Sequence, residues 1–258
     1  RFSMKCGVTS SVMSLDFRTG IMTRTVHCTS SDGTSFTVKA ERLVSFENKT
    51  CAALRYSVTA DACASGSAAI SLESAIDMSV SNISAEEDPR VGAKFSSRPL
   101  ITDSVSSSDG ILRFSSHTRN SGLLLAGTAV NVLTADGCSV HTSYSSEGSP
   151  SVLYSFTLSA GQTAVLEKFI SYDTAASSEC GDTSVPAEAG TAHAADFASA
   201  GFDAAAEAQR AYLSSFWETA RMKIEGSEAD EKAVNFNLFH LLQSAGKDGK
   251  TSIAAKGL

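Results

Sequence analysis

Hydrophobic and polar positions follow two different periods along the chain, and the change between them divides the sequence. From residue 12 to about residue 172, apolar and polar residues alternate with a period of two, which is typical of half-buried β-strands. Asp-Gly pairs interrupt this alternation, and each is a strong hairpin signal because both residues tolerate a positive φ. The pairs are Asp32-Gly33, Asp109-Gly110 and Asp136-Gly137, with softer turns at Ser149-Pro150 and Ala160-Gly161. Roughly ten strands joined in this way predict a large antiparallel β-sandwich.

The later part of the chain predicts helices. Residues 176–200 are rich in Ala, Ser, Gly and Glu without alternation, and this composition favours a linker. Residues 202–222 place apolar side chains on one broad face with the period of an amphipathic helix. A second helix is expected from Ser227, whose hydroxyl can cap it, to Gly246. Its apolar residues cover nearly the whole circumference, so this helix needs neighbours on most sides.

Composition narrows the class of protein but indicates no chemistry. The 258 residues are 42% hydrophobic and 19% charged, which suits a packed core. The formal net charge is −7 and no basic stripe is present, which argues against a nucleic-acid partner. The apolar runs are far shorter than the roughly 18–20 residues that span a bilayer, so no membrane segment is expected. The six cysteines lack metal-ligand spacing, and we expect reduced thiols in a cytoplasmic protein.

Familiar catalytic motifs are missing from the sequence. It holds no G-x-S-x-G elbow, P-loop, G-x-G-x-x-G or H-E-x-x-H. The five histidines are scattered, and His27 and His141 lie in predicted strands, where a structural role is favoured. The acidic run 86–88 precedes a proline and favours a solvated turn. Trp217 and Tyr212 resemble a sugar-stacking pair, but their position on a helix favours packing. The motifs therefore predict no catalytic and no metal-ligating residue.

Several short phrases occur in an order that is typical of one family. In the predicted sandwich they are Leu15–Arg24, Glu41–Ser45, Leu54–Thr59 and Ile70–Asp77. In the helical part they are Trp217, Ile224–Gly226, Phe236–Leu241 and Ile253–Leu258. The series resembles the N-terminal β-sandwich, linker helix and first barrel helix of the family 65 glycoside phosphorylases, which include maltose, kojibiose and trehalose phosphorylases. Asn235 and Ala254 depart from the family, which usually has arginine and glycine at these positions.

The resemblance implies a fold and a domain arrangement. The expected fold is mainly β, with a large antiparallel β-sandwich, or super-sandwich, followed by a helical linker and the start of an (α/α)6 barrel. The β-sandwich domain is expected over residues 1–175, without the family's N-terminal strands. The linker is expected over residues 176–200, and residues 201–258 are expected to form the linker helix and the first helix of a truncated catalytic barrel.

The resemblance also implies an activity. Most family members cleave an α-linked glucose disaccharide with inorganic phosphate as co-substrate and invert the anomeric carbon, without a metal or other cofactor. A carboxylic acid protonates the departing oxygen while phosphate attacks from the opposite face. The family's general acid follows the A-K-G-L motif, so no catalytic residue is expected here, and only Lys256 and Gly257 are expected near the substrate. The resemblance thus predicts an inactive fragment of an inverting glycoside phosphorylase.

Two other functions stay open at this stage. The parent protein could be a hydrolase of the same family, such as a trehalase, or the chain could be a non-catalytic β-sandwich carbohydrate-binding module. Without a barrel, the apolar helix after Ser227 must pack on the sandwich, associate with another copy or stay disordered, so a homodimer is one expected outcome. Burying four or five Leu or Phe side chains favours such contacts by on the order of 10 kcal/mol before entropy.

Overall fold

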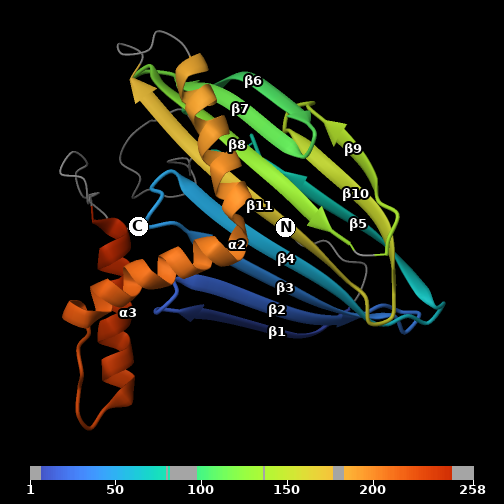
Figure 1. Ribbon diagram of the computed structural model, residues 1–258, viewed down its shortest axis with the longest axis horizontal. Helices are drawn as coiled ribbons and strands as arrows, with labels where there is room; N and C mark the ends of the chain where they lie inside the picture. The colour runs from blue at the N-terminus through green and yellow to red at the C-terminus, as the bar shows by residue number, and fades with distance from the viewer. Residues whose placement is uncertain (1–6, 80, 82–97, 136, 177–182, 246–258) are drawn as a thin grey trace, which may run out of the picture.

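The computed structural model describes residues 7–79, 81, 98–135, 137–176 and 183–245. Within these residues the chain forms eleven strands followed by two helices (Figure 1). The strands are β1 (Gly7–Asp16), β2 (Ile21–Thr29), β3 (Ser35–Val44), β4 (Cys51–Ala62), β5 (Ser67–Ala75), β6 (Leu100–Ser108), β7 (Ile111–Thr118), β8 (Leu123–Thr134), β9 (His141–Ser145), β10 (Ser151–Ser159) and β11 (Thr163–Ala176). The helices are α2 (Ser184–Ala220) and α3 (Glu228–Ser244).

Two antiparallel sheets form the β-sandwich. The large sheet has the order β1-β2-β3-β4-β11-β8-β7-β6, and the small sheet has the order β5-β10-β9. Apolar side chains of alternate residues meet between the sheets, as the period of two requires. They include Val38, Val58, Leu112, Val152, Phe156, Leu158 and Leu166. The predicted mainly β sandwich followed by helices is therefore confirmed.

The Asp-Gly signals locate two of the hairpins correctly. At Asp109-Gly110 the φ angles are 50° and 76°, and Ser108 pairs with Ile111 across the turn. This two-residue loop needs a positive φ at both positions, which Asp and Gly supply at low cost. Asp32-Gly33 lies between β2 and β3, which pair from Thr29 and Ser35 beside the turn to Met22 and Arg42. Ser149-Pro150 likewise joins two paired strands, β9 and β10.

The hairpin predicted at Asp136-Gly137 is wrong. β8 before it belongs to the large sheet, whereas β9 after it belongs to the small sheet. Ala160-Gly161 also joins strands of different sheets, because β10 lies in the small sheet and β11 in the large one. A turn residue reports that the chain reverses, but the same chemistry serves a hairpin and a crossing between layers. Asp136 itself lies outside the described residues.

Most of the predicted linker, residues 176–200, is helical rather than irregular. α2 begins at Ser184 and continues to Ala220, with non-helical angles only at Gly201 (φ 82°, ψ 167°). Alanine has the highest helix propensity, and the small side chains of Gly190 and Ala194 allow this half of α2 to lie close to the sheet. The helix predicted over 202–222 forms the second half of α2. No described helix is long and apolar enough to cross a membrane.

α2 packs on the face of the large sheet that is opposite the small sheet (Figure 1). Phe169 of β11 is fully buried there and contacts Phe197 of α2 edge to face. The guanidinium of Arg55 on β4 pairs with Glu167 and with Asp203 of α2, both at 2.8 Å. It also lies 4.4 Å from the centre of the Phe202 ring. These contacts fix both halves of α2 on the sheet.

The four described cysteines form no disulfide with one another. Cys28 and Cys51 are buried, and Cys63 and Cys138 are half-buried. Burial raises the pKa of the Cys51 thiol, because a thiolate would lose its hydration there. A thiol held in its neutral form is a poor nucleophile. Cys6 and Cys180 lie outside the described residues.

Lys168 is an unusual residue for the space between the two sheets. It shares a face of β11 with the core residues Ala164 and Leu166, and its Nζ donates a hydrogen bond to the Ala75 carbonyl at 2.8 Å. Burial lowers the pKa of its ammonium group from the ordinary 10.5 to about 8. The folded chain therefore loses this proton before the unfolded chain does, and this term raises stability as the pH rises from about 8 to 10.5.

We expect Lys168→Met to raise the free energy of unfolding at pH 7 by about 1–3 kcal/mol, because it removes a buried charge. The gain should shrink as the pH rises from 8 toward 10.5, where the wild-type lysine becomes neutral in both states. Urea unfolding of both proteins at pH 7, 9 and 10.5 measures this difference. A difference that does not change with pH would contradict the assignment.

Candidate functional site

Two His–Asp pairs lie in the described part of the chain, and such a pair is one component of a catalytic triad. His117 pairs with Asp103, and His193 pairs with Asp173, each through Nδ1 at 2.8 Å. In a nucleophilic triad the carboxylate binds one ring nitrogen and the nucleophile binds the other. The Thr50 hydroxyl lies 3.5 Å from the same Nδ1 of His193 that Asp173 occupies. This arrangement cannot relay a proton through the ring to Thr50.

Cys51 lies near His193 but does not complete a catalytic pair. Its Sγ is 4.0 Å from the backbone carbonyl oxygen of His193 and contacts that oxygen. Asp173 is 7% exposed, and its Oδ2 has no hydrogen-bond partner among the described residues. Ser171 Oγ donates to the Gly190 carbonyl at 2.6 Å in the same region. This polar group therefore joins β11 to the first half of α2 and is structural.

The carboxyl groups give no sign of a general acid in the described part of the chain. A general acid for glycoside cleavage needs a raised pKa. The resolved carboxyl shifts all lower the pKa, and they belong to Asp32, Asp77, Asp203 and Glu231. The described ranges also contain no group of three His, Cys, Asp or Glu side chains suited to a metal ion.

Polar and aromatic side chains of several elements meet at the junction between the sandwich and the helices. Its first part is the β1–β2 turn, which the phrase Leu15–Arg24 encodes. Asp16 closes this turn, because its Oδ1 accepts from the Arg18 N–H and its carbonyl accepts from the Gly20 N–H. Gly20 has φ 64°, and a Cβ there would lie 2.8 Å from Nε2 of Gln209. A side chain at this position would push α2 away from the turn.

Polar groups of α2 bind the strand ends directly. Gln209 is 2% exposed, and its amide donates to the Val44 carbonyl and accepts from the Phe46 N–H at 3.0 and 2.9 Å. The indole Nε1 of Trp217 donates to the Phe17 carbonyl at 2.7 Å. The ring of Tyr212 stacks on Phe46 at a centroid distance of 5.3 Å. The packing role predicted for Trp217 and Tyr212 is thus confirmed.

α3 is held at the same junction by one buried ring. Ser227 caps the helix, as predicted, by accepting from the Asp230 N–H at 3.3 Å. Phe239 is fully buried, and its ring stacks on Phe17 at a centroid distance of 5.5 Å. Phe236 packs on the same Phe17 ring at a centroid distance of 5.8 Å, whereas the opposite side of α3 is open at Leu241, which is 65% exposed. The sandwich therefore covers only one side of the helix.

Asn235 connects α3 to the segment that precedes it. Its amide oxygen accepts from the Met222 N–H at 3.1 Å, and its amide nitrogen donates to the Met222 and Glu231 carbonyls at 2.8 Å each. Glu231 binds the same segment, because its carboxylate accepts from the Ile224 N–H at 3.3 Å and pairs with Arg221 at 3.2 Å. The asparagine that departs from the family pattern therefore has a defined role in fixing the α2–α3 connection.

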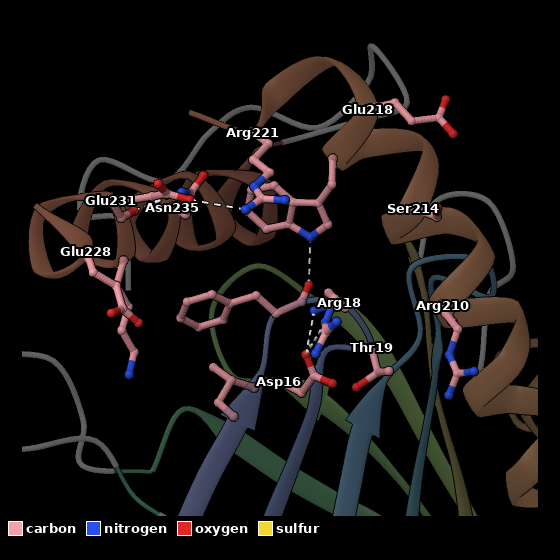
Figure 2. A pocket seen from close by; sticks show the side chains of 14 residues that line it. Asp16, Arg18, Thr19, Arg210, Ser214, Glu218, Arg221, Glu228, Glu231 and Asn235 are labelled. Carbon is pink, nitrogen blue, oxygen red and sulfur yellow. Dashed lines mark hydrogen bonds and ion pairs between the residues drawn. The ribbon is translucent and has the colours of Figure 1, made fainter. Parts of the chain in front are cut away.

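A cleft of about 1010 Å³ lies between the β1–β2 turn, the end of α2 and the start of α3. Figure 2 shows Glu231 and Asn235 turned toward Arg221, and Asp16 beside Arg18 on the turn. Hydrogen bonding to Arg221 and to the Ile224 N–H lowers the pKa of Glu231 and keeps it ionised. The ion pair between Arg221 and Glu231 stabilises the junction at this cleft.

Lys256 and Gly257, expected near the substrate, lie outside the described residues, as does the acidic run 86–88. His27 lies on β2, and its Nδ1 is 2.8 Å from the Thr37 hydroxyl. The helical pattern places Gln209 on the apolar face of the helix, but the sequence predicts no role for its amide group. Its position in line with the apolar residues Phe202, Ala205 and Leu213 was the available signal.

The match of the sequence to a protein-family model shows the family of the chain. The model described as "Glycosyl hydrolase family 65, N-terminal domain" matches residues 1–216, which include every described strand and most of α2. The chain belongs to glycosyl hydrolase family 65. Among the phrases that resemble this family, Leu15–Arg24 contains the β1–β2 turn, and Trp217, Ile224–Gly226 and Phe236–Leu241 lie in the helical part of the junction.

Two curated relatives and one solved structure agree with this family 65 assignment. The alpha,alpha-trehalose phosphorylase of Thermoanaerobacter brockii is 35% identical over 246 residues, which cover 95% of this chain and 31% of that protein. The kojibiose phosphorylase of Caldanaerobacter subterraneus subsp. tengcongensis is 45% identical over 64 residues, 24% of this chain and 8% of that protein. A structure named as a kojibiose phosphorylase from the human microbiome matches with a TM-score of 0.76 and 14% identity, covering 93% of this chain and 29% of the other, which shows a shared fold.

Proposed function

We propose that this family 65 chain is the N-terminal sandwich and helical linker of an inverting phosphorylase for an α-linked glucose disaccharide. The observation that carries the proposal is the match of 95% of the chain to a trehalose phosphorylase at 35% identity. The chain spans 31% of that relative's length, so the reaction itself is assigned to the longer protein. By itself, the chain is proposed to turn over no sugar.

In this proposal the chain contributes to the reaction by fixing the position of α3. Phe239 holds α3 on the sandwich, Gln209 holds α2 there, and Asn235 fixes the connection between the two helices. α3 leads toward residues 246–258, and Lys256 and Gly257 are proposed to lie near the substrate. The longer protein supplies a carboxylic acid that protonates the glycosidic oxygen. Inorganic phosphate then attacks the anomeric carbon from the opposite face, in the place of the water of an inverting hydrolase.

Because phosphate brings its own nucleophilic oxygen, the proposed reaction needs no metal or other cofactor. The test is to incubate the longer protein with trehalose, kojibiose, nigerose or maltose, with and without inorganic phosphate, in the presence of a chelator. We expect glucose 1-phosphate from one of these disaccharides, and only when phosphate is present. The 258-residue chain assayed in parallel should release no product.

Two outcomes would contradict the proposal in different ways. Release of two glucose molecules without phosphate would indicate the trehalase-like hydrolase. If the longer protein is inactive on every disaccharide while calorimetry detects binding of one by the 258-residue chain, the sandwich is a carbohydrate-binding module.

A further inference from the structure

Helix α2 bends at a single residue. Its backbone angles are non-helical only at Gly201, where φ is 82° and ψ is 167°. This combination of angles is open almost only to glycine. A Cβ at Gly201 would have no atom within 4 Å, so the backbone conformation, and not a lack of space, requires glycine here. Figure 1 shows the first half of α2 lying across the large sheet and the second half turned toward α3.

The bend lets two phenylalanines enter one apolar cluster. Phe197 before the bend is 6% exposed, and Phe202 after it is 2% exposed. Both belong to the buried cluster that contains Phe169 of β11. In an uninterrupted α-helix, side chains five residues apart point about 140° away from each other. A straight helix would therefore direct only one of the two rings at the sheet, and the burial of both favours the bent form.

Arg55 of β4 binds the first turn of α2 after the bend. Its guanidinium pairs with Asp203 at 2.8 Å and lies 4.4 Å from the centre of the Phe202 ring. Glu167 lies opposite Arg55 in the sheet register and pairs with the same guanidinium at 2.8 Å. The planar guanidinium contacts two carboxylates and a ring together, which a lysine ammonium group does not match. Arg55 thus fixes the second half of α2 to two strands of the large sheet.

The second half of α2 carries the angle of the bend to the junction. It is a continuous helix, and its Gln209 and Trp217 bind the strand ends there. Because an α-helix rises about 1.5 Å per residue, a tilt of about 5° at Gly201 would move Trp217 by about 2 Å. The connection to α3, which Asn235 holds, would move with it. A displacement of about 1 Å in a catalytic site can lower the rate about a hundredfold.

We propose that Gly201 and Arg55 are positioning residues for the reaction of the longer protein. Together they set the angle at which α2 reaches the junction, and through α2 they set the position of α3 and of the segment that follows it. In this role they act through the helices and do not contact the substrate. The inference rests on the proposed function, because it takes α3 to lead toward the substrate.

Steady-state kinetics of the longer protein separates this role from a purely structural one. Gly201→Ala and Arg55→Met should lower kcat about tenfold or more and change KM for the disaccharide less than about threefold. Gly161→Ala is the control for the first variant, because Gly161 has the same φ of 82° and equally open surroundings between β10 and β11. Lys39→Met is the control for the second, because it removes a 2.8 Å ion pair with Glu41 within β3. Both controls should keep kcat within about twofold.

Trp217 gives a second readout that needs no activity. It is the only tryptophan in the 258-residue sequence, and its indole donates to the Phe17 carbonyl at the junction. A change in the angle of the bend should loosen this contact and expose the ring. Acrylamide quenching of Trp217 fluorescence in the 258-residue chain should therefore rise about twofold in Gly201→Ala and Arg55→Met. The two controls should leave the quenching unchanged.

A milder variant decides the question if Arg55→Met fails to fold. Asp203→Ala removes one partner of the same guanidinium, and the Asp203 side chain is 87% exposed, so no charge is left buried by the change. Its matched control is Glu207→Ala, which removes an ion pair with Arg210 that lies within α2. Asp203→Ala should lower kcat about threefold, whereas Glu207→Ala should leave it unchanged.

Two results would overturn the inference. In the first, kcat and Trp217 quenching in the variants at the bend are the same as in their controls. In the second, kcat falls only in proportion to the fraction of protein that is folded, which would assign Gly201 and Arg55 a structural role alone. A longer protein that cleaves no disaccharide would contradict the proposed function, and Trp217 quenching would then still decide whether these residues set the position of α2.

Discussion

Gly127→Ala is expected to destabilise the chain by about 3 kcal/mol, one of the largest effects of any single methyl group in this fold. Gly127 of β8 lies directly opposite Phe114 of β7 in the sheet register. A Cβ at Gly127 would lie 2.1 Å from Cε1 of Phe114 and under 3 Å from two more ring atoms. Phe114 is 6% exposed and packs edge to face against Tyr172, so its ring has little room to move.

Urea denaturation of the variant measures this cost, and two controls make it specific. Gly7→Ala in β1 should be neutral, because the nearest atom to its new Cβ, the Thr29 carbonyl oxygen, is 3.8 Å away. Phe114→Leu should relieve the clash, so the double variant should lose less stability than the two single variants added together. Additive losses, or a neutral Gly127→Ala, would show that the ring does not occupy this place.

Phe239→Ala is expected to release α3 from the sandwich. The Phe239 side chain is fully buried between α3 and the rings of Phe17 and Phe46, at centroid distances of 5.5 and 6.4 Å. Truncating a buried phenylalanine costs about 3–5 kcal/mol, and the polar contacts of Asn235 are too weak to offset this loss. Hydrogen exchange should become fast throughout α3, while the amides of β4, β8 and β11 stay protected.

Leu241→Ala provides the matched control on the same helix. Leu241 is 65% exposed, so its truncation should change neither the stability of the chain nor the exchange of α3. If Phe239→Ala leaves α3 protected, then the aromatic contact does not hold the helix. If it instead unfolds the strands together with α3, the helix and sandwich form one cooperative unit.

The strands were the part of the fold that the sequence predicted best. Alternation along a strand has a direct physical cause, since one face of each sheet is buried. The turn at Asp109-Gly110 was predicted equally well, because few residues other than Asp and Gly adopt its positive φ angles at low cost. The sequence did not predict that β8 and β9 belong to different sheets. This assignment depends on packing between layers, which local turn chemistry does not report.

The helices were predicted in part, for a different reason. Ser227 identified the start of α3, because a capping hydroxyl acts locally. The first half of α2 was missed because small residues such as Gly190 and Ala194 resemble a linker in composition, although here they allow close packing. Gln209 binds the backbone of Phe46, which is distant along the chain. Asn235 binds the backbone of Met222, in the segment that connects α2 to α3. The sequence pattern does not predict such contacts, because they depend on how the helices and strands pack at the junction.

The most direct test of the central claim is the stereochemistry of the product. Proton NMR would follow the longer protein as it acts on its disaccharide in the presence of inorganic phosphate. The proposed inverting attack on an α-linked glucoside predicts that β-glucose 1-phosphate forms first, in step with loss of the disaccharide. Formation of α-glucose 1-phosphate, or of free glucose at the same rate without phosphate, would contradict it.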